Sequence, residues 1–277
     1  MRIGFHMPFS GSLNKLRERV VVSRGNTFQV YARSLRGGKL QSLKKKPLQE
    51  FHEFLEKKDI NPIIVHAPYV YNLAKAETED VEKILEDLVF AEQIRAPYYV
   101  LQPGYSKGIH PIEAIENIKT HLLHILEKTE WYGEILIKNM AGAGSEVGSN
   151  LQEWNELVSF HPQVKGAMDF SRAYSAGYDF TTKEEAELFI EEIEEVVCWD
   201  KIKLVYIQDN ERGCGSKKNY FPPLGEGVIG FQGYEHVLAN DIIKEKIWLV
   251  ENQPEIDYYD RSISYLTGFF LNTKEGK

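Results

Sequence analysis

Cysteine is scarce in this sequence of 277 residues, which contains only Cys198 and Cys214, with no CxxC or CxxH spacing. This scarcity argues against a disulfide framework and against a thiolate zinc site, and it favours a reducing, cytoplasmic location. No apolar run approaches the roughly 20 residues that span a bilayer, so we expect no membrane partner. The N-terminal stretch MRIGFHMPFSGSL also lacks the longer apolar run and cleavage site of a signal peptide.

An excess of positive charge is also missing, because the formal net charge is −8. A negative net charge disfavours non-specific binding to polyanions, although local clusters decide whether one face can meet DNA. Two basic stretches are present: residues 32–46 carry six basic residues and no acidic one, and residues 216–218 read Ser-Lys-Lys. Acidic residues gather instead in 183–196, which we interpret as a solvated helix face.

Short β-branched or aromatic runs alternate with segments of helical period along the whole chain. Eight runs predict strands, and several lack an apolar/polar alternation, as expected for parallel strands covered on both faces. Six segments between them show apolar residues at helical spacing. The strands are predicted at 2–6, 27–31, 62–66, 98–102, 134–138, 166–170, 203–207 and 247–251, and the helices at 47–58, 78–94, 112–129, 182–197, 231–245 and 259–271.

Eight strand–helix units predict an α/β fold of the (β/α)₈ type, a TIM barrel that occupies residues 1–277 as a single domain. An open doubly wound sheet is the alternative, but it usually has fewer strands and a glycine-rich first turn, and GSLNKL at 11–16 is no GxGxxG motif. In such a barrel the chemistry lies where strands end. The polar residues at these ends are His6, Tyr31–Arg33, His66, Gln102, Lys138–Asn139, Asp169, Tyr206–Asp209 and Glu251.

Six sequence motifs fall at these strand ends and in the loops that follow them. They are VHAPYVYNL (65–73), QPG (102–104), NMAGAGSEVG (139–148), MDFSRAYSAGYDF (168–180), LGEGVIG (224–230) and LVEN (249–252). Through these motifs the chain resembles endonuclease IV, the barrel-fold apurinic/apyrimidinic (AP) endonuclease, over nearly its whole length. The resemblance implies a barrel whose family members hydrolyse the DNA backbone at abasic sites.

The resemblance also implies where metal ligands stand, because that family holds a cluster of zinc ions with histidines and carboxylates at the strand ends. Of the nine matching positions, only His66, Asp169 and Glu251 keep a ligand residue. The nine former metal-ligand positions are His66, Gln102, Lys138, Asp169, Arg172, Tyr206, Asn219, Phe221 and Glu251.

Two of the replacements are cations, Lys138 and Arg172, and two carboxylates remain, Asp169 and Glu251. Lysine and arginine are no zinc ligands at neutral pH and they repel a metal ion, whereas they pair well with buried carboxylates. We therefore predict no metal, no zinc cluster and no other cofactor at this rim.

Other matches imply contact with DNA. The family inserts a tyrosine and an aliphatic residue into the duplex from the loop after its third strand, and Tyr69 and Val70 stand at the matching spacing. An arginine of the second loop enters the base stack in that family, and Arg36 matches it. Insertion of an aromatic and an arginine side chain lowers the cost of opening a base step. DNA is therefore the expected partner, with other proteins of a DNA-processing, viral or cellular complex as further candidates.

These matches favour an endonuclease IV-like protein that has lost the zinc-dependent cleavage and binds damaged, abasic or modified DNA, or acts as a scaffold. Whether it is an enzyme stays open at this point. An active form would be a repair-type AP endonuclease with an altered metal site, or a metal-independent lyase or glycosylase with Lys138 as nucleophile. A sugar-isomerase-like enzyme is the remaining alternative. The candidate catalytic residues of the pocket are Lys138, Asp169 and Glu251.

Overall fold

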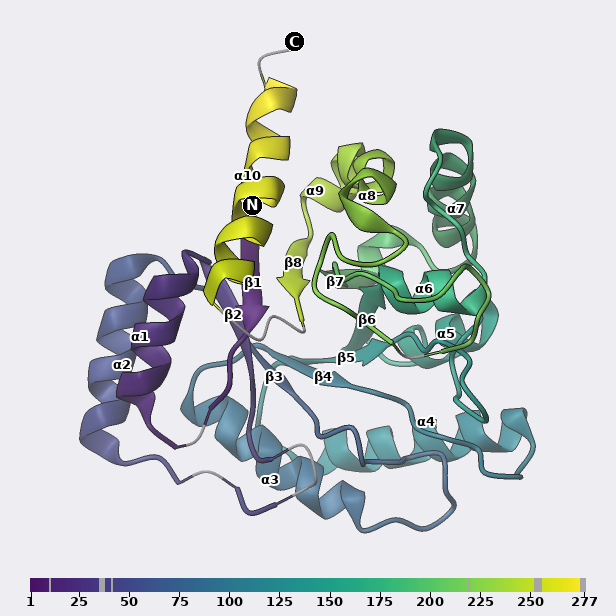
Figure 1. The fold of residues 1–277 in the computed structure, drawn as a ribbon. Coiled ribbons are helices and arrows are strands. Elements are labelled where there is room, and N and C mark those ends of the chain that lie inside the picture. The colour runs from purple at the N-terminus through teal and green to yellow at the C-terminus, as the bar shows by residue number, and fades with distance from the viewer. Residues whose placement is uncertain (10, 35–37, 41, 219, 252–255, 275–277) are drawn as a thin grey trace.

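The computed structural model describes residues 1–9, 11–34, 38–40, 42–218, 220–251 and 256–274 of the chain. Its eight parallel strands form a closed barrel in chain order, with β1 hydrogen-bonded to both β2 and β8, which confirms the predicted fold (Figure 1). The strands are β1 (Arg2–His6), β2 (Thr27–Tyr31), β3 (Ile63–His66), β4 (Tyr98–Leu101), β5 (Glu134–Lys138), β6 (Val164–Asp169), β7 (Ile202–Tyr206) and β8 (Ile247–Val250).

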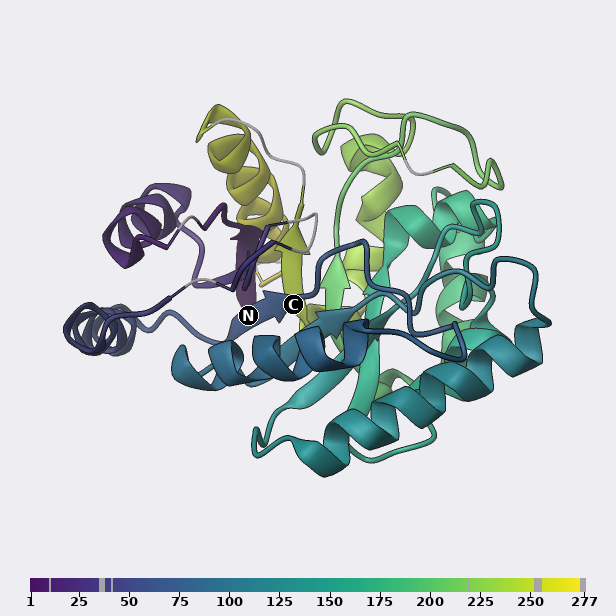
Figure 2. The same cartoon turned by 90° about the horizontal axis from the view of Figure 1, so that it is seen from below.

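Helices surround this barrel, and in the view of Figure 2 α1 and α2 lie to one side while α3 and α4 lie along another. None of the helices among the described residues has the length and apolar character needed to cross a membrane. They are α1 (Leu13–Ser23), α2 (Lys45–Lys58), α3 (Asp80–Gln93), α4 (Pro111–Lys128), α5 (Leu151–Val158), α6 (Phe170–Ala176), α7 (Lys183–Val196), α8 (Gly230–Ala239), α9 (Asp241–Lys244) and α10 (Ile256–Lys274), with a 3₁₀ turn at Trp199–Lys201.

Two apolar layers explain why the strands lack a simple alternation. One face of the strands fills the barrel interior, and the other face packs under the helices, so both faces avoid water. The interior cluster contains seven buried residues: Ile64, Val100, Leu136, Ala167, Leu204, Tyr206 and Leu249. The acidic segment 183–196 forms α7 with Ala186, Phe189 and Ile193 turned to the core, which agrees with its interpretation as a helix with a solvated face.

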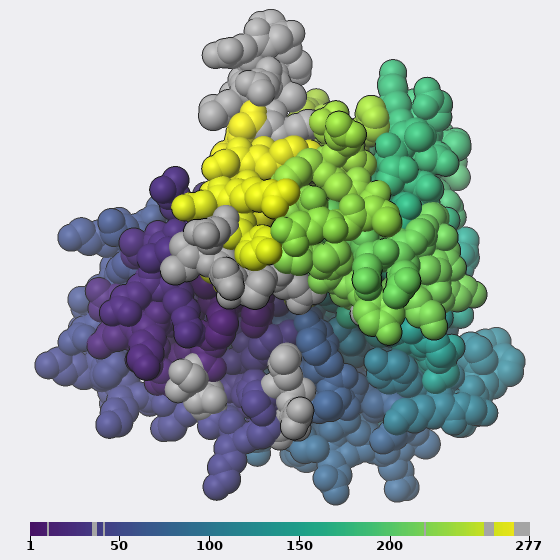
Figure 3. Space-filling view, in the orientation of Figure 1, coloured from purple at the N-terminus to yellow at the C-terminus, as the bar shows by residue number. Residues whose placement is uncertain are grey.

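The last helix, α10, packs on the outside of the barrel beside β1. Its Tyr265 ring lies 4.2 Å from the Phe231 ring of α8, measured between ring centroids, and its hydroxyl donates to the Phe231 carbonyl. Figure 3 shows α10, in yellow, between the purple N-terminal segment and the green segment that precedes β8. The two ends of the chain therefore share one wall of the barrel.

The loop between β7 and α8, which carries the LGEG motif, is tied down by the buried carboxylate of Asp209. This carboxylate accepts hydrogen bonds from the backbone N–H groups of Gly225, Ile229 and Gly230 at 2.9–3.1 Å. A Cβ atom at Gly227 would lie 2.4 Å from Asp209 Oδ1, so only glycine permits this close approach. The carboxylate thus holds the loop at the carboxyl end of the barrel.

Candidate functional site

A buried ion-pair network lies at the carboxyl ends of β5, β6 and β8. Lys138 Nζ is 2.9 Å from Glu251 Oε2 and 3.1 Å from Asp169 Oδ2, and it stands 3.5 Å from the centre of the Tyr206 ring. Neither Lys138 nor Asp169 has exposed side-chain surface. We call Lys138, Asp169, Glu251 and Arg172 the rim network.

The ammonium group of Lys138 favours the ionised form of Glu251. Burial by itself raises the pKa of Glu251. The positive charge of Lys138 outweighs this effect and, together with the hydrogen bond from Gln29, lowers the pKa to about 2. A carboxylate removed from water is stable only when it is paired and hydrogen-bonded. The network therefore holds Glu251 in the ionised form at neutral pH.

Two glutamine amides complete the pairing of these carboxylates. Gln29 Nε2 donates to Glu251 Oε1 at 2.9 Å, while its Oε1 accepts from the Tyr206 hydroxyl, and Gln208 Nε2 donates to Asp169 Oδ2 at 2.8 Å. Sequence reasoning missed Gln29. Its signal was a polar residue at the centre of TFQVY, a strand that is buried along most of its length.

Arg172 adds a second cation to the rim. Its Nε lies 3.4 Å from Asp169 Oδ2, and its guanidinium group stands 5.5 Å from the centre of the Phe221 ring. Asp169 also caps α6, because its Oδ1 accepts from the Arg172 N–H at 3.1 Å. Asn219, another of the nine matching positions, lies outside the described residues.

His66 sits at the end of β3 among tyrosine rings. Its ring centroid lies 5.3 Å from those of Tyr31 and Tyr69, and 6.5 Å from that of Tyr206. Burial lowers the pKa of His66 to about 3, so the imidazole is neutral at physiological pH. The structure therefore brings His66 to the rim, as predicted, and surrounds it with aromatic walls.

The residues matched to DNA insertion are only partly described. Tyr69 is half-buried against His66, and Val70 is 55% exposed beside it. Arg36 lies outside the described residues. Arg33, which belongs to the same basic stretch, is not at the surface: it is buried and paired with Asp87 at 2.7 Å.

The ligating atoms of the rim can be tested against a zinc cluster. Within the described ranges, no group of three or more histidine, cysteine, aspartate or glutamate side chains is arranged to hold a metal ion. Lys138 takes up oxygen lone pairs of both carboxylates, and His66 supplies one further nitrogen. As arranged here, the residues do not fit the cluster.

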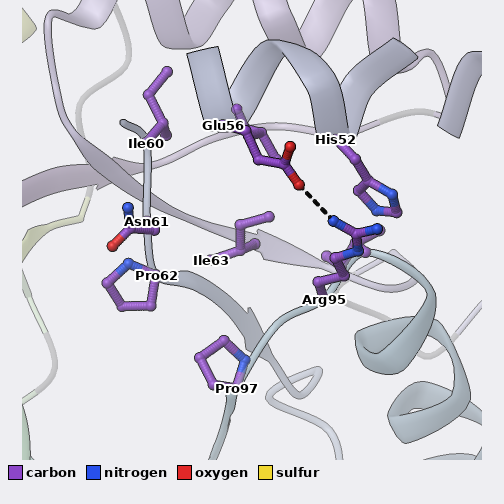
Figure 4. A pocket seen from close by; sticks show the side chains of 10 residues that line it. His52, Glu56, Ile60, Asn61, Pro62, Ile63, Arg95 and Pro97 are labelled. Carbon is purple, nitrogen blue, oxygen red and sulfur yellow. Dashed lines mark hydrogen bonds and ion pairs between the residues drawn. The ribbon is translucent and has the colours of Figure 1, made fainter. Parts of the chain in front are cut away.

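A cavity lies at the end of the barrel opposite the rim network, where β3 and β4 begin. It has a volume of about 350 Å³ and an apolar floor, and an exposed ion pair between Glu56 and Arg95, at 2.7 Å, crosses its edge (Figure 4). Its lining comes from α2 and the segments before β3 and β4, so the rim network contributes nothing to it.

Comparison with known proteins agrees with the barrel fold described above. Residues 22–268 match the family described as Xylose isomerase-like TIM barrel. The chain is 31% identical to the probable endonuclease 4 of Carboxydothermus hydrogenoformans, with 93% of each chain covered, and 30% identical to that of Aquifex aeolicus, with 97% and 98% covered. The crystal structure of endonuclease IV from Thermus thermophilus superposes with a TM-score of 0.86 at 24% identity, covering 98% of this chain and all of that one.

These relatives correct one prediction. We expected no zinc and no other cofactor, but the comparisons align the chain with endonuclease IV homologues, which are zinc-dependent enzymes. The prediction relied on the replacement of six of the nine matching positions, two of them by the cations Lys138 and Arg172, and a count of substituted ligands does not decide the cofactor of a protein. The matched family and the two relatives show that the chain belongs to the endonuclease IV family of xylose isomerase-like TIM barrels.

Proposed function

We propose that the chain is a DNA-repair-related protein that binds damaged, abasic or modified DNA at its rim without the backbone hydrolysis of its family. One observation carries this proposal: the Lys138 ammonium lies within 3.1 Å of both Asp169 and Glu251. Carboxylates paired in this way are no longer open to activate a water molecule for attack on phosphorus. Lys138, Asp169 and Glu251 then lie buried beneath the binding surface.

Membership of the endonuclease IV family supports DNA as the partner. The geometry of the mouth adds to this, because Tyr69 and exposed Val70 follow β3 at the edge of the rim. A basic surface contributes the sequence-independent part of DNA affinity, and the loop after β7 carries Lys217 and Lys218. A role as a scaffold within a DNA-processing complex is compatible with the same surface.

Lyase chemistry by Lys138 is not favoured by these contacts. A Schiff base requires an amine that is free to attack, and Lys138 Nζ is held in salt bridges to Asp169 and Glu251 at 3.1 and 2.9 Å. Nor does the rim favour a sugar isomerase, since such enzymes rely on the same carboxylates to hold metal ions.

The proposal is tested by binding of fluorescent duplexes to the full chain, measured by anisotropy at several salt concentrations. One duplex contains a tetrahydrofuran abasic analogue, and its control has an intact base pair at that position. We expect the abasic duplex to bind about tenfold more tightly, because opening a damaged step costs less. Equal and weak binding of both duplexes at low salt would remove the DNA proposal.

A further inference from the structure

The cavity at the end of the barrel opposite the rim network has the size and the lining of a small-molecule site. Its volume of about 350 Å³ falls in the range of ligand pockets. Such pockets are mostly apolar and carry a few polar groups that orient the ligand. Here the apolar part consists of four buried aliphatic side chains: Leu55, Ile60, Ile63 and Ile94.

Two helices, α2 and α3, end at this cavity with the same pattern of hydrogen bonds. At α2 the N–H of Ile60 donates to the Leu55 carbonyl at 3.0 Å. At α3 the N–H of Ala96 donates to the Ala91 carbonyl at 2.8 Å, and both bonds are those of the Schellman motif. This motif places one residue in the left-handed conformation, and at α3 that residue is Arg95, with a φ of 59°. A long charged side chain therefore stands at the cavity edge, at a backbone position where glycine is usual.

The ion pair at this edge uses only part of its hydrogen-bonding capacity. Arg95 Nη1 donates to Glu56 Oε1 at 2.7 Å, and both side chains are more than half exposed. A guanidinium group has several further N–H donors and a carboxylate has a second oxygen, so both side chains can contact a ligand as well. Exposed pairs of this kind contribute little to stability, so a ligand can separate the two side chains at small cost.

His52 adds an uncharged acceptor beside the pair, as Figure 4 shows. Burial and the nearby charge of Arg95 lower the pKa of His52 from its ordinary value of 6.5, so the ring is neutral at pH 7. Its Nε2 lies 3.1 Å from the Gln93 carbonyl oxygen, which can only accept, so Nε2 carries the proton and Nδ1 holds a lone pair. The edge thus offers donors on Arg95 and acceptors on Glu56 and His52.

These groups favour a ligand that carries both signs of charge. A ligand with a carboxylate alone would pair with Arg95 but face the like charge of Glu56, and a ligand with an ammonium alone would face the like charge of Arg95. A zwitterion leaves neither side chain against a like charge. An α-amino acid carries an ammonium and a carboxylate on the same carbon, and an apolar side chain on that carbon gains by covering the aliphatic floor.

We propose that this cavity binds a free α-amino acid with an apolar side chain. The carboxylate of the ligand accepts hydrogen bonds from Arg95, its ammonium group donates to Glu56 and to His52 Nδ1, and its side chain lies on the aliphatic floor. The site is separate from the rim network, and the inference does not rest on the proposed function.

Isothermal titration calorimetry of the full chain tests the proposal with L-phenylalanine and L-leucine as probes. Each probe is compared with its desamino acid, which lacks the ammonium group, with its decarboxylated amine, which lacks the carboxylate, and with L-alanine, which lacks the large side chain. We expect the better probe to bind at least about tenfold more tightly than each comparison compound, because each of these loses one of the three contacts. Failure of both probes to bind at about 10 mM would overturn the proposal, and so would equal affinity for a probe and its singly charged analogues.

Two variants assign the binding to the cavity. Arg95→Gly removes the donors and places glycine at a left-handed position, so we expect affinity to fall at least about tenfold without a fall in melting temperature. Glu56→Gln keeps the shape of the side chain, removes its charge and should weaken binding to a similar extent. The matched control is Arg24→Gly, which should leave the affinity unchanged: Arg24 ends α1 with a φ of 57°, pairs with Asp260 and is not among the described residues that line the cavity.

The comparison of these variants decides where the ligand binds. Unchanged affinity in both Arg95→Gly and Glu56→Gln would overturn the proposal, because the amino acid would then bind away from the cavity. An equal loss of affinity in Arg24→Gly and Arg95→Gly would overturn it as well.

Discussion

Two buried charge clusters of the barrel differ in how completely their polar atoms are paired. In the first, which we call the Arg33 cluster, Arg33 Nε lies 2.7 Å from Asp87 Oδ1, while the hydroxyl groups of Tyr99 and Tyr71 donate to Asp87 Oδ2 at 2.9 and 3.2 Å. Glu86, at 2.8 Å from Arg33, completes it. None of its buried side-chain nitrogen or oxygen atoms lacks a partner within the described residues.

The rim network is also buried and charged, yet its surroundings leave three polar atoms unpaired: His66 Nε2, Gln102 Nε2 and Arg172 Nε. Both clusters carry the cost of removing charges from water. Of the two, the rim alone retains unused hydrogen-bonding capacity among the described residues. The Arg33 cluster ties the start of the β2–α2 loop to α3, which fits a role in stabilising the fold, whereas the unpaired atoms of the rim fit the binding role that we propose for it.

The largest effect is expected when the Arg33 cluster is broken. Arg33→Ala leaves the Asp87 carboxylate buried without its cation, and we expect a loss of about 3–5 kcal/mol in the free energy of unfolding. Urea denaturation measures it. The matched control is Arg95→Ala, which breaks the exposed pair with Glu56 and should cost less than about 1 kcal/mol. Similar losses for the two variants would contradict a structural role for the Arg33 cluster.

A smaller effect on stability is expected from acid at the rim. Glu251 has a pKa of about 2 in the folded chain and 4.5 as its ordinary value. Since the folded pKa is depressed, the contribution of Glu251 is fully present above about pH 4.5 and is lost as the pH falls towards 2. It amounts to about 3 kcal/mol. Chemical denaturation across this pH range measures it in the wild-type chain.

Glu251→Gln supplies the control for the acid experiment, because the amide does not titrate. The difference in stability between wild type and variant should shrink as the pH falls from 4.5 towards 2. A difference that stays constant over this interval would show that Lys138 does not hold Glu251 ionised.

Substitutions in the loop after β3, at the edge of the rim, should change the free energy of DNA binding by less than the stability changes above. Tyr69→Ala removes a stacking surface, and we expect affinity for the abasic duplex to fall about tenfold, the loss of roughly 1–1.5 kcal/mol of stacking. Tyr132→Ala is the matched control, since Tyr132 is 94% exposed just before β5, at the opposite end of the barrel, and should change affinity less than twofold. Equal losses for the two tyrosines would place the DNA elsewhere.

The smallest effect is expected for Val70→Ala, which shortens an exposed aliphatic side chain next to Tyr69. We expect a loss of about twofold to threefold in affinity for the abasic duplex. Val89→Ala, on the exposed face of α3, is its control and should leave the affinity unchanged. An unchanged affinity for Val70→Ala would limit the inserted surface to Tyr69.

Most of the fold could be predicted from the sequence, because strand and helix periods are local patterns. The predicted strands at 2–6, 27–31 and 134–138 match β1, β2 and β5 residue for residue. The predicted helix at 231–245 is wrong in one respect: it is divided into α8 and α9 at Asn240, whose side chain accepts from the Ile242 N–H at 2.9 Å. Helices α1, α5 and α6 were not predicted, since two of them are short and α1 has a weak apolar stripe.

The hydrogen bonds that surround the ion pairs of the candidate site were beyond sequence reasoning. The convergence of Lys138, Asp169 and Glu251 followed from their places at strand ends. The Gln29–Glu251 hydrogen bond joins residues 222 positions apart, and it depends on the closure of β1, β2 and β8. The unpaired nitrogen of His66 depends on how the ring is turned, which no sequence pattern specifies.

The central claim is that a lysine held between two carboxylates has replaced hydrolysis by binding at this rim. Strand cleavage of an abasic duplex tests it most directly, measured on a denaturing gel with the purified chain in excess zinc and, separately, in chelator. The account predicts that the duplex is bound and stays uncut in both conditions. Repeated cleavage in zinc that chelator abolishes would contradict it.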